Sequence, residues 1–137
     1  MTIPKDYSYQ ESPSAFVNHV GKIYHKRSTA ADGGEEVWTA LEIQDHHVNT
    51  WGFCHGAVMS SLAEMGTAAP AWDPDGPPVV AIEMNMQFIR APKLGQLLEV
   101  CGTVSQRTRS LVFCQARAYA DGELVFTASS IQKILKA

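Results

Sequence analysis

The chain has 137 residues, of which 45% are hydrophobic and 18% are charged. This length and balance predict a single domain over residues 1–137 with a real hydrophobic core, and they exclude a disordered chain. The net charge of −3 at pH 7 gives no general attraction to nucleic acid. We therefore expect no nucleic-acid partner, and any binding of an anionic ligand must be local.

Cysteine usage and hydropathy indicate the compartment. The chain has three cysteines, an odd number, and no CxxC pair, which is typical of reduced thiols in a reducing environment. The first 14 residues lack the apolar core of a signal peptide, and no run of about 18 apolar residues occurs. We expect a soluble, cytoplasmic protein with no membrane partner.

The first half of the chain predicts a short helix, two strands and one long helix. Apolar residues recur at helical spacing after a proline in residues 12–20. Residues 21–28 and 36–43 are typical of strands on either side of an Asp-Gly-Gly turn at 32–34. The long helix is expected over about 55–71, where a segment rich in proline and glycine ends it.

The second half predicts a sheet. Apolar and polar residues alternate strictly over 80–88, which predicts a half-buried strand. Residues 96–106 and 111–120 continue the pattern, and Asp121-Gly122 is a strong hairpin signal before a last strand over 123–133. One long helix beside a run of antiparallel strands predicts an α+β fold with the sheet wrapped around the helix.

The predicted central helix carries one charged residue, Glu64. Small residues surround Glu64 at helical spacing, while the opposite face is apolar and belongs against the sheet. Either Glu64 lies on an ordinary solvated face, or it is a covered carboxylate with a raised pKa that suits a general base. His55 lies about 180° around the helix from Glu64, so two catalytic residues here would need two subunits. This geometry predicts an obligate dimer.

Asn49, His55 and Gly56 place an amide, an imidazole and a helix N-terminus close together. At Gly56 unpaired N–H groups favour negative charge that develops on a thioester carbonyl, or the glycine only permits tight packing. Asn49 either orients a water or forms a turn. His55 either binds substrate or hydrogen-bonds Asn49 and shapes the loop, and we favour the second role.

Two further groups have alternative interpretations. His46, His47, Cys54 and His55 fit no zinc spacing, and no CxxC or HExxH accompanies them, so we expect no metal. Adjacent Cys54 and His55 are poorly placed for a nucleophile–base pair. The basic turns that contain Arg90 and Lys93 are either merely solvated or grip a phosphorylated carrier such as coenzyme A.

The pattern Asn49…Gly52-x-x-His55-Gly56, with Glu64 eight residues later, resembles the signature of hotdog-fold acyl-CoA thioesterases. The similarity is to the phenylacetyl-CoA and 4-hydroxybenzoyl-CoA thioesterase type. It implies hydrolysis of an acyl-CoA or aryl-CoA substrate, a homodimer or dimer of dimers, and no cofactor. By position, Asn49 would orient water or substrate, Gly56 would donate its N–H to the carbonyl, and His55 would support it. Glu64 would be the base or nucleophile, acting across the dimer interface.

The resemblance runs from about residue 21 to the C-terminus, with residues 80–85 and 91–95 similar to the family's third strand and following turn. The chain departs from the family in three ways: Ala57 replaces a second glycine, glutamate replaces aspartate at position 64, and Ala81 lacks a hydroxyl that some relatives carry. Thr67 or Ser61 is a candidate to compensate. The residues expected to contact substrate are Phe53, Ala57, Thr67, Ala81, Arg90 and Lys93.

Two other functions remain open from the sequence. A hotdog hydratase or dehydratase also pairs a histidine with a helix carboxylate, although the proline-rich approach loop typical of such enzymes is missing. A non-catalytic acyl-CoA binding protein is the other alternative, because Ala81 and the change to glutamate both depart from the catalytic pattern.

Overall fold

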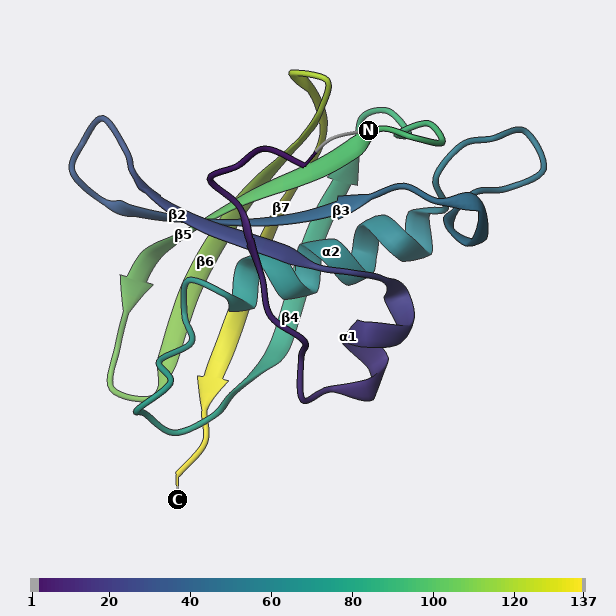
Figure 1. The fold of residues 1–137 in the computed structure, drawn as a ribbon. Coiled ribbons are helices and arrows are strands. Elements are labelled where there is room, and N and C mark those ends of the chain that lie inside the picture. The colour runs from purple at the N-terminus through teal and green to yellow at the C-terminus, as the bar shows by residue number, and fades with distance from the viewer. Residues whose placement is uncertain (1–2, 137) are drawn as a thin grey trace.

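The computed structural model describes residues 3–136 (Figure 1). In chain order its elements are β1 (Ser8–Tyr9), α1 (Ala15–Val20), β2 (Tyr24–Thr29), β3 (Glu35–Glu42), the 3-10 helix η1 (Asp45–His47), α2 (Gly56–Ala68), β4 (Val79–Phe88), β5 (Leu97–Arg107), β6 (Leu111–Ala120) and β7 (Glu123–Ile134). The strands of this range form one antiparallel sheet in the order β1-β2-β3-β5-β6-β7-β4.

The sheet curves around α2, which lies across its concave face in Figure 1. Leu62 and Ala63 of α2 are fully buried against the inward residues of the sheet, among them Leu98 and Val100 of β5 and Phe126 of β7. Burial of this apolar surface is the main stabilising contribution to such a layer pair. The α+β architecture predicted from the sequence is confirmed.

Local signals explain most of the element boundaries. The Ser14 hydroxyl caps α1 by accepting a hydrogen bond from the N–H of Val17 at 3.4 Å. Between β6 and β7, Asp121 and Gly122 both have positive φ, 50° and 76°. Two such residues make the type of tight turn that matches the twist of the flanking strands, so the predicted hairpin is confirmed.

The structure differs from the prediction at the end of α2 and at two short elements. The helix ends at Ala68, three residues early, because Pro70 has no N–H to continue it and the N–H groups of Ala71 and Trp72 both turn back to the Ala68 carbonyl. The two-residue strand β1 and the three-residue 3-10 helix η1 were not predicted, since neither has a periodic pattern. No helix of residues 3–136 is long and apolar enough to cross a membrane.

The predicted strand over 80–88 is confirmed as β4, but in the single chain its apolar side is buried only in part. β4 is the edge strand of the sheet and pairs only with β7, with a register shift between Ala81 and Glu83. Val80, Ile82 and Phe88 are 43%, 58% and 54% exposed. The alternation is present in the sequence, but among the described residues Met84 and Met86 pack against the core while the other three apolar side chains stay exposed.

Candidate active site

A closed hairpin loop leads into α2. The N–H of Asn49 donates to the carbonyl oxygen of Phe53, and the N–H of His55 donates to that of His47, each at 2.9 Å. At the tip, the side-chain oxygen of Asn49 accepts from the N–H groups of Trp51 and Phe53 at 2.9 and 3.1 Å. The oxygen of Asn49 therefore forms the turn. Its side-chain NH₂ group has no acceptor among residues 3–136, which leaves it free to donate to a ligand.

The N-terminus of α2 presents two unused donors. His55 is the N-cap, and its carbonyl oxygen accepts from Val58 and Met59 at 3.0 and 3.2 Å. In the described range the N–H groups of Gly56 and Ala57 find no acceptor. Orphan donors at a helix start carry partial positive charge and suit an oxygen that gains negative charge.

The side chain of His55 does not shape the loop as we expected. It is exposed, and it forms no hydrogen bond with Asn49, whose oxygen is already occupied by two backbone N–H groups. His55 immediately precedes the open donors in the chain, and its side chain makes no capping hydrogen bond to them.

Packing alone does not require glycine at position 56. A Cβ built on Gly56 would lie 3.5 Å from two ring atoms of Phe88, an ordinary van der Waals contact. Of the two interpretations that the sequence left open, tight packing is therefore not supported. A side chain here would instead partly screen the N–H groups at the helix start.

Glu64 is exposed and has no hydrogen bond or ion pair with any described residue. The neighbouring hydroxyls do not compete for it, since Ser60 and Ser61 donate to the carbonyl oxygens of Gly56 and Ala57 at 2.8 and 3.0 Å. Eight residues of helix separate Gly56 from Glu64, a rise of about 12 Å. In one chain these two groups cannot contact the same carbonyl carbon.

Thr67 is not available to a substrate. Its side chain is fully buried, and its hydroxyl donates to the carbonyl oxygen of Ala63 at 2.8 Å, so the expectation that Thr67 contacts substrate is not met. Ser61 is only partly exposed, and its hydroxyl is likewise bound to the backbone. Ala81 is exposed on β4 beside the register shift, where it supplies no hydroxyl.

Three of the predicted contact residues line one open cavity of about 500 Å³ near the start of α2. The cavity is bordered by Phe53, Arg90, Ala91, Lys93, Gln96, Ala120, Glu123 and Val125. Arg90 forms an ion pair with Glu123, with both side chains more than half exposed. Lys93 has no ion-pair partner within residues 3–136, which leaves its ammonium group available to an anion.

A larger groove of about 770 Å³ lies beside the second half of α2. Met65 and Ala68 line it from the helix, Trp72 from the segment that follows, and His25 and Arg27 from β2. The pKa of His25 is lowered by burial and by the charge of Arg27, so its ring stays neutral near pH 7. Ala68 follows Glu64 by one helical turn, so one wall of the groove lies a turn beyond the residue that carries the carboxylate.

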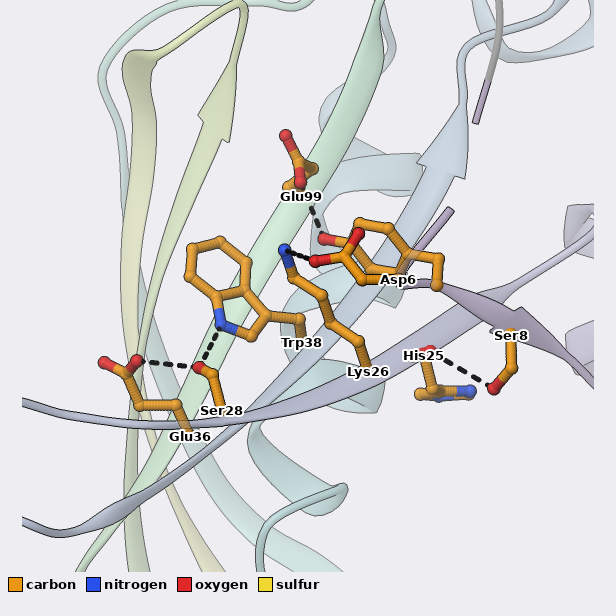
Figure 2. Close-up of polar contacts among 9 residues, drawn as sticks. Asp6, Ser8, His25, Lys26, Ser28, Glu36, Trp38 and Glu99 are labelled. Carbon is orange, nitrogen blue, oxygen red and sulfur yellow. Dashed lines mark hydrogen bonds and ion pairs between the residues drawn. The ribbon is translucent and has the colours of Figure 1, made fainter. Parts of the chain in front are cut away.

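The groove was missed in the sequence because its far wall is the N-terminal segment, which carries no periodic signal. Figure 2 shows the contacts that hold this segment to the outer face of the sheet. The Tyr7 hydroxyl donates to Glu99 at 2.6 Å, and Lys26 pairs with Asp6 at 3.1 Å. Burial and the nearby Glu99 carboxylate raise the pKa of Tyr7, which keeps its proton and the hydrogen bond.

The histidine and cysteine cluster has structural partners. His46 and His47 both direct Nε2 at the carbonyl oxygen of Val20, at 3.1 and 2.5 Å. Cys54 is buried, and burial raises its pKa to about 11, which disfavours a thiolate nucleophile. In the described part of the chain, no three His, Cys, Asp or Glu residues are grouped as a metal site.

An antiparallel sheet wrapped around one long helix, with open backbone donors at the helix start and a carboxylate on its outer face, defines a hotdog-fold protein. The model of the thioesterase superfamily matches residues 52–127, more than half of the chain. The chain belongs to this superfamily and is a thioester hydrolase.

Individual relatives agree with this assignment. A provisionally named esterase of Pseudomonas aeruginosa is 26% identical over 133 residues, which are 96% of either chain. Human acyl-coenzyme A thioesterase 13 is 27% identical over 86 residues, 62% of this chain and 60% of that protein. The structure of zebra fish thioesterase superfamily member 2 has a TM-score of 0.74 at 22% identity and covers 91% of this chain and 89% of its own. A hypothetical thioesterase of Streptococcus pneumoniae with coenzyme A has a TM-score of 0.68 at 16% identity, covering 82% of this chain and 87% of its own.

Proposed function

We propose that this protein hydrolyses an acyl- or aryl-CoA thioester to the free acid and CoA. The observation that carries the proposal is the pair of open N–H groups at Gly56 and Ala57, on a helix that also carries the unpaired carboxylate of Glu64. The named activity of the human relative and the coenzyme A in the pneumococcal structure support a CoA ester as substrate.

In the proposed reaction, Glu64 accepts a proton from a water molecule as the water oxygen attacks the thioester carbon. The carbonyl oxygen gains negative charge, which the N–H of Gly56 stabilises. The carbon–sulfur bond then breaks, and the CoA thiolate takes the proton from Glu64, which returns the carboxylate. Direct attack by Glu64, followed by hydrolysis of an anhydride, uses the same groups. The free NH₂ of Asn49 orients the water or the carbonyl. His55, whose side chain is exposed next to Gly56 in the chain, has a supporting role near the thioester carbonyl.

The site requires two subunits. Gly56 and Glu64 are separated by about 12 Å along one helix, so the carboxylate must act on a thioester held by the helix start of another chain. The β4 edge supports this arrangement, because it exposes Val80, Ile82 and Phe88 beside α2. The hydroxyl oxygen of Ser60 also lies 3.4 Å from the sulfur of Met86, so the Glu64 side of the helix packs against that strand. A second copy of the chain on this surface would cover both the exposed edge of β4 and the Glu64 side of α2. The assembly would be a homodimer or a dimer of dimers.

In this proposal the cavity and the groove bind different parts of the substrate. The cavity at Phe53, Arg90 and Lys93 would receive the phosphates of CoA, mainly through the unpaired ammonium of Lys93. Ala57 would contact the thioester next to the open donors. The groove at Ala68 and Trp72 would receive the acyl or aryl group, because it begins one turn beyond Glu64.

Release of free CoA thiol from a panel of short, long and aryl CoA esters tests the proposal. We expect turnover of at least one class. Hydration of crotonyl-CoA without thiol release would instead show a hydratase. Tight binding of CoA esters with no turnover of any member would show a binding protein, the function that the missing hydroxyl at Ala81 favours.

A further inference from the structure

We propose that His47 is a positioning residue for the oxyanion-stabilising end of α2, an inference that rests on the proposed role of Gly56. His47 does not approach the substrate site itself, since its side chain is only 1% exposed. It joins the end of α1, the start of η1 and the N-cap of α2. The direction of the Gly56 N–H therefore depends on an imidazole that the reaction never contacts.

The imidazole of His47 uses both of its nitrogens. Nδ1 accepts a hydrogen bond from the backbone N–H of Gln44 at 2.9 Å. Nε2 lies 2.5 Å from the carbonyl oxygen of Val20, the last residue of α1. A backbone N–H can only donate and a carbonyl oxygen can only accept, so Nδ1 has no proton and Nε2 has one. The two contacts thus fix a single neutral tautomer.

The backbone of His47 transmits this anchoring to α2. Its carbonyl oxygen accepts the N–H of His55 at 2.9 Å, which closes the base of the hairpin loop. An isolated bridge between Val48 and Cys54 forms the next rung of that hairpin. His55 is the N-cap, and Gly56 follows it directly. A shift of His47 would therefore move the two residues that set the direction of the open donors.

The neighbourhood of the ring favours the neutral form. The ring of His46 lies against that of His47, with 3.9 Å between centroids and 43° between the ring planes. The pKa of His47 is lowered by burial and, to a smaller extent, by His46, while the hydrogen bond to Val20 opposes the decrease. A neutral ring keeps Nδ1 as an acceptor, which the contact with Gln44 requires.

The variant His47→Ala removes both side-chain contacts, and His47→Gln keeps a donor that can reach Val20. We expect kcat of His47→Ala to fall about tenfold or more at nearly unchanged KM, because a displaced donor weakens transition-state stabilisation. His47→Gln should recover part of that loss. The matched control is His46→Ala, which removes the other imidazole directed at Val20 and should keep kcat within about twofold.

Backbone amide NMR separates positioning from general damage. The amide resonance of Gly56 should shift in His47→Gln, while that of Gly66, buried near the other end of the same helix, should stay in place. Equal shifts at both glycines, or unchanged kcat in both His47 variants, would overturn the proposal.

If His47→Ala does not fold, ¹⁵N NMR of the wild-type imidazole still decides the central point. We expect an unprotonated Nδ1 and a protonated Nε2 on His47, and the reverse tautomer would overturn the inference. Should the wild-type protein hydrolyse no CoA ester, the proposed function fails separately. The amide and imidazole measurements would still decide whether His47 positions the helix start.

Discussion

Gly102 of β5 faces the backbone of Gly66 so closely that a Cβ built on Gly102 would lie 2.0 Å from the Gly66 carbonyl oxygen. A Cβ on Gly66 would in turn lie 2.5 Å from a methyl group of Val100. These two glycines allow the second half of α2 to lie directly on the centre of the sheet. The depth of the helix, and with it the height of Glu64 above the sheet, follows from this contact.

We expect Gly102→Ala to lower the free energy of unfolding by about 1–3 kcal/mol, because the added methyl group meets backbone that cannot rotate away. Gly56→Ala is the matched control, since its methyl group would make only an ordinary contact with Phe88. Urea unfolding followed by circular dichroism measures both variants. If Gly102→Ala were as stable as Gly56→Ala, the close approach of helix and sheet would be wrong.

The carboxylate of Glu64 should matter for turnover and not for folding. Glu64→Gln keeps the size of the side chain but cannot accept a proton, so we expect kcat to fall about 10²–10⁴-fold. Because Glu64 forms no ion pair with a described residue of its own chain and glutamine has nearly the same size, the midpoint of thermal unfolding should change little. Glu83→Gln, an exposed carboxylate on β4, is the control. Full activity of Glu64→Gln would refute the proposed mechanism.

Patterns that are local in the sequence predicted the elements well. Alternation over β4 to β7 and the Asp121-Gly122 turn depend on neighbouring residues only, and the structure confirms these strands. The spacing from Gly56 to Glu64 likewise predicted where the open donors and the carboxylate would lie on α2, because helix geometry is regular.

Contacts between distant residues could not be predicted in this way. The N-terminal segment is held by the hydrogen bond from Tyr7 to Glu99, which joins residues 92 positions apart. The groove beside Ala68 depends on that segment, so no local pattern indicated it. The exposure of Ile82 was missed for a related reason, since alternation predicts an apolar side but not which molecule covers it.

The ion pair between Arg90 and Glu123 should weaken phosphate binding at the cavity beside Phe53. Glu123→Gln removes the competing carboxylate and leaves Arg90 free to bind phosphate. We therefore expect KM for a CoA ester to fall by about two- to fivefold at low salt, because an exposed charge pair contributes less than about 1 kcal/mol. The decrease should shrink at high ionic strength. Lys93→Gln should act in the opposite direction. An unchanged KM in both variants would place the CoA phosphates elsewhere.

The groove at Ala68 should set the size of the acyl group that is accepted. Ala68→Leu adds three carbon atoms to its wall one turn beyond Glu64, so long acyl-CoA and aryl-CoA esters should lose kcat/KM by about tenfold relative to acetyl-CoA. Thiol release across the panel measures this ratio. Ala69→Leu, on the adjoining position of the same groove, tests whether the effect follows the distance from the carboxylate. A uniform loss for all esters would instead indicate a damaged fold.

Two histidines should make stability depend on pH below neutrality. Burial lowers the pKa of both His25 and His47 from the ordinary value of 6.5, so the unfolded chain binds more protons than the folded chain in this range. The free energy of unfolding should therefore be highest above about pH 6.5 and decrease as the pH falls toward 5, with a slope of at most about 1.4 kcal/mol per pH unit for each histidine. Urea unfolding at about pH 7.5, 6.5, 5.5 and 5, values that span the ordinary histidine pKa, measures how the free energy of unfolding changes with pH. His47→Gln and His25→Gln should each flatten the curve, and the double variant should flatten it most. If the curve were unchanged in the double variant, neither histidine would be held neutral by its surroundings.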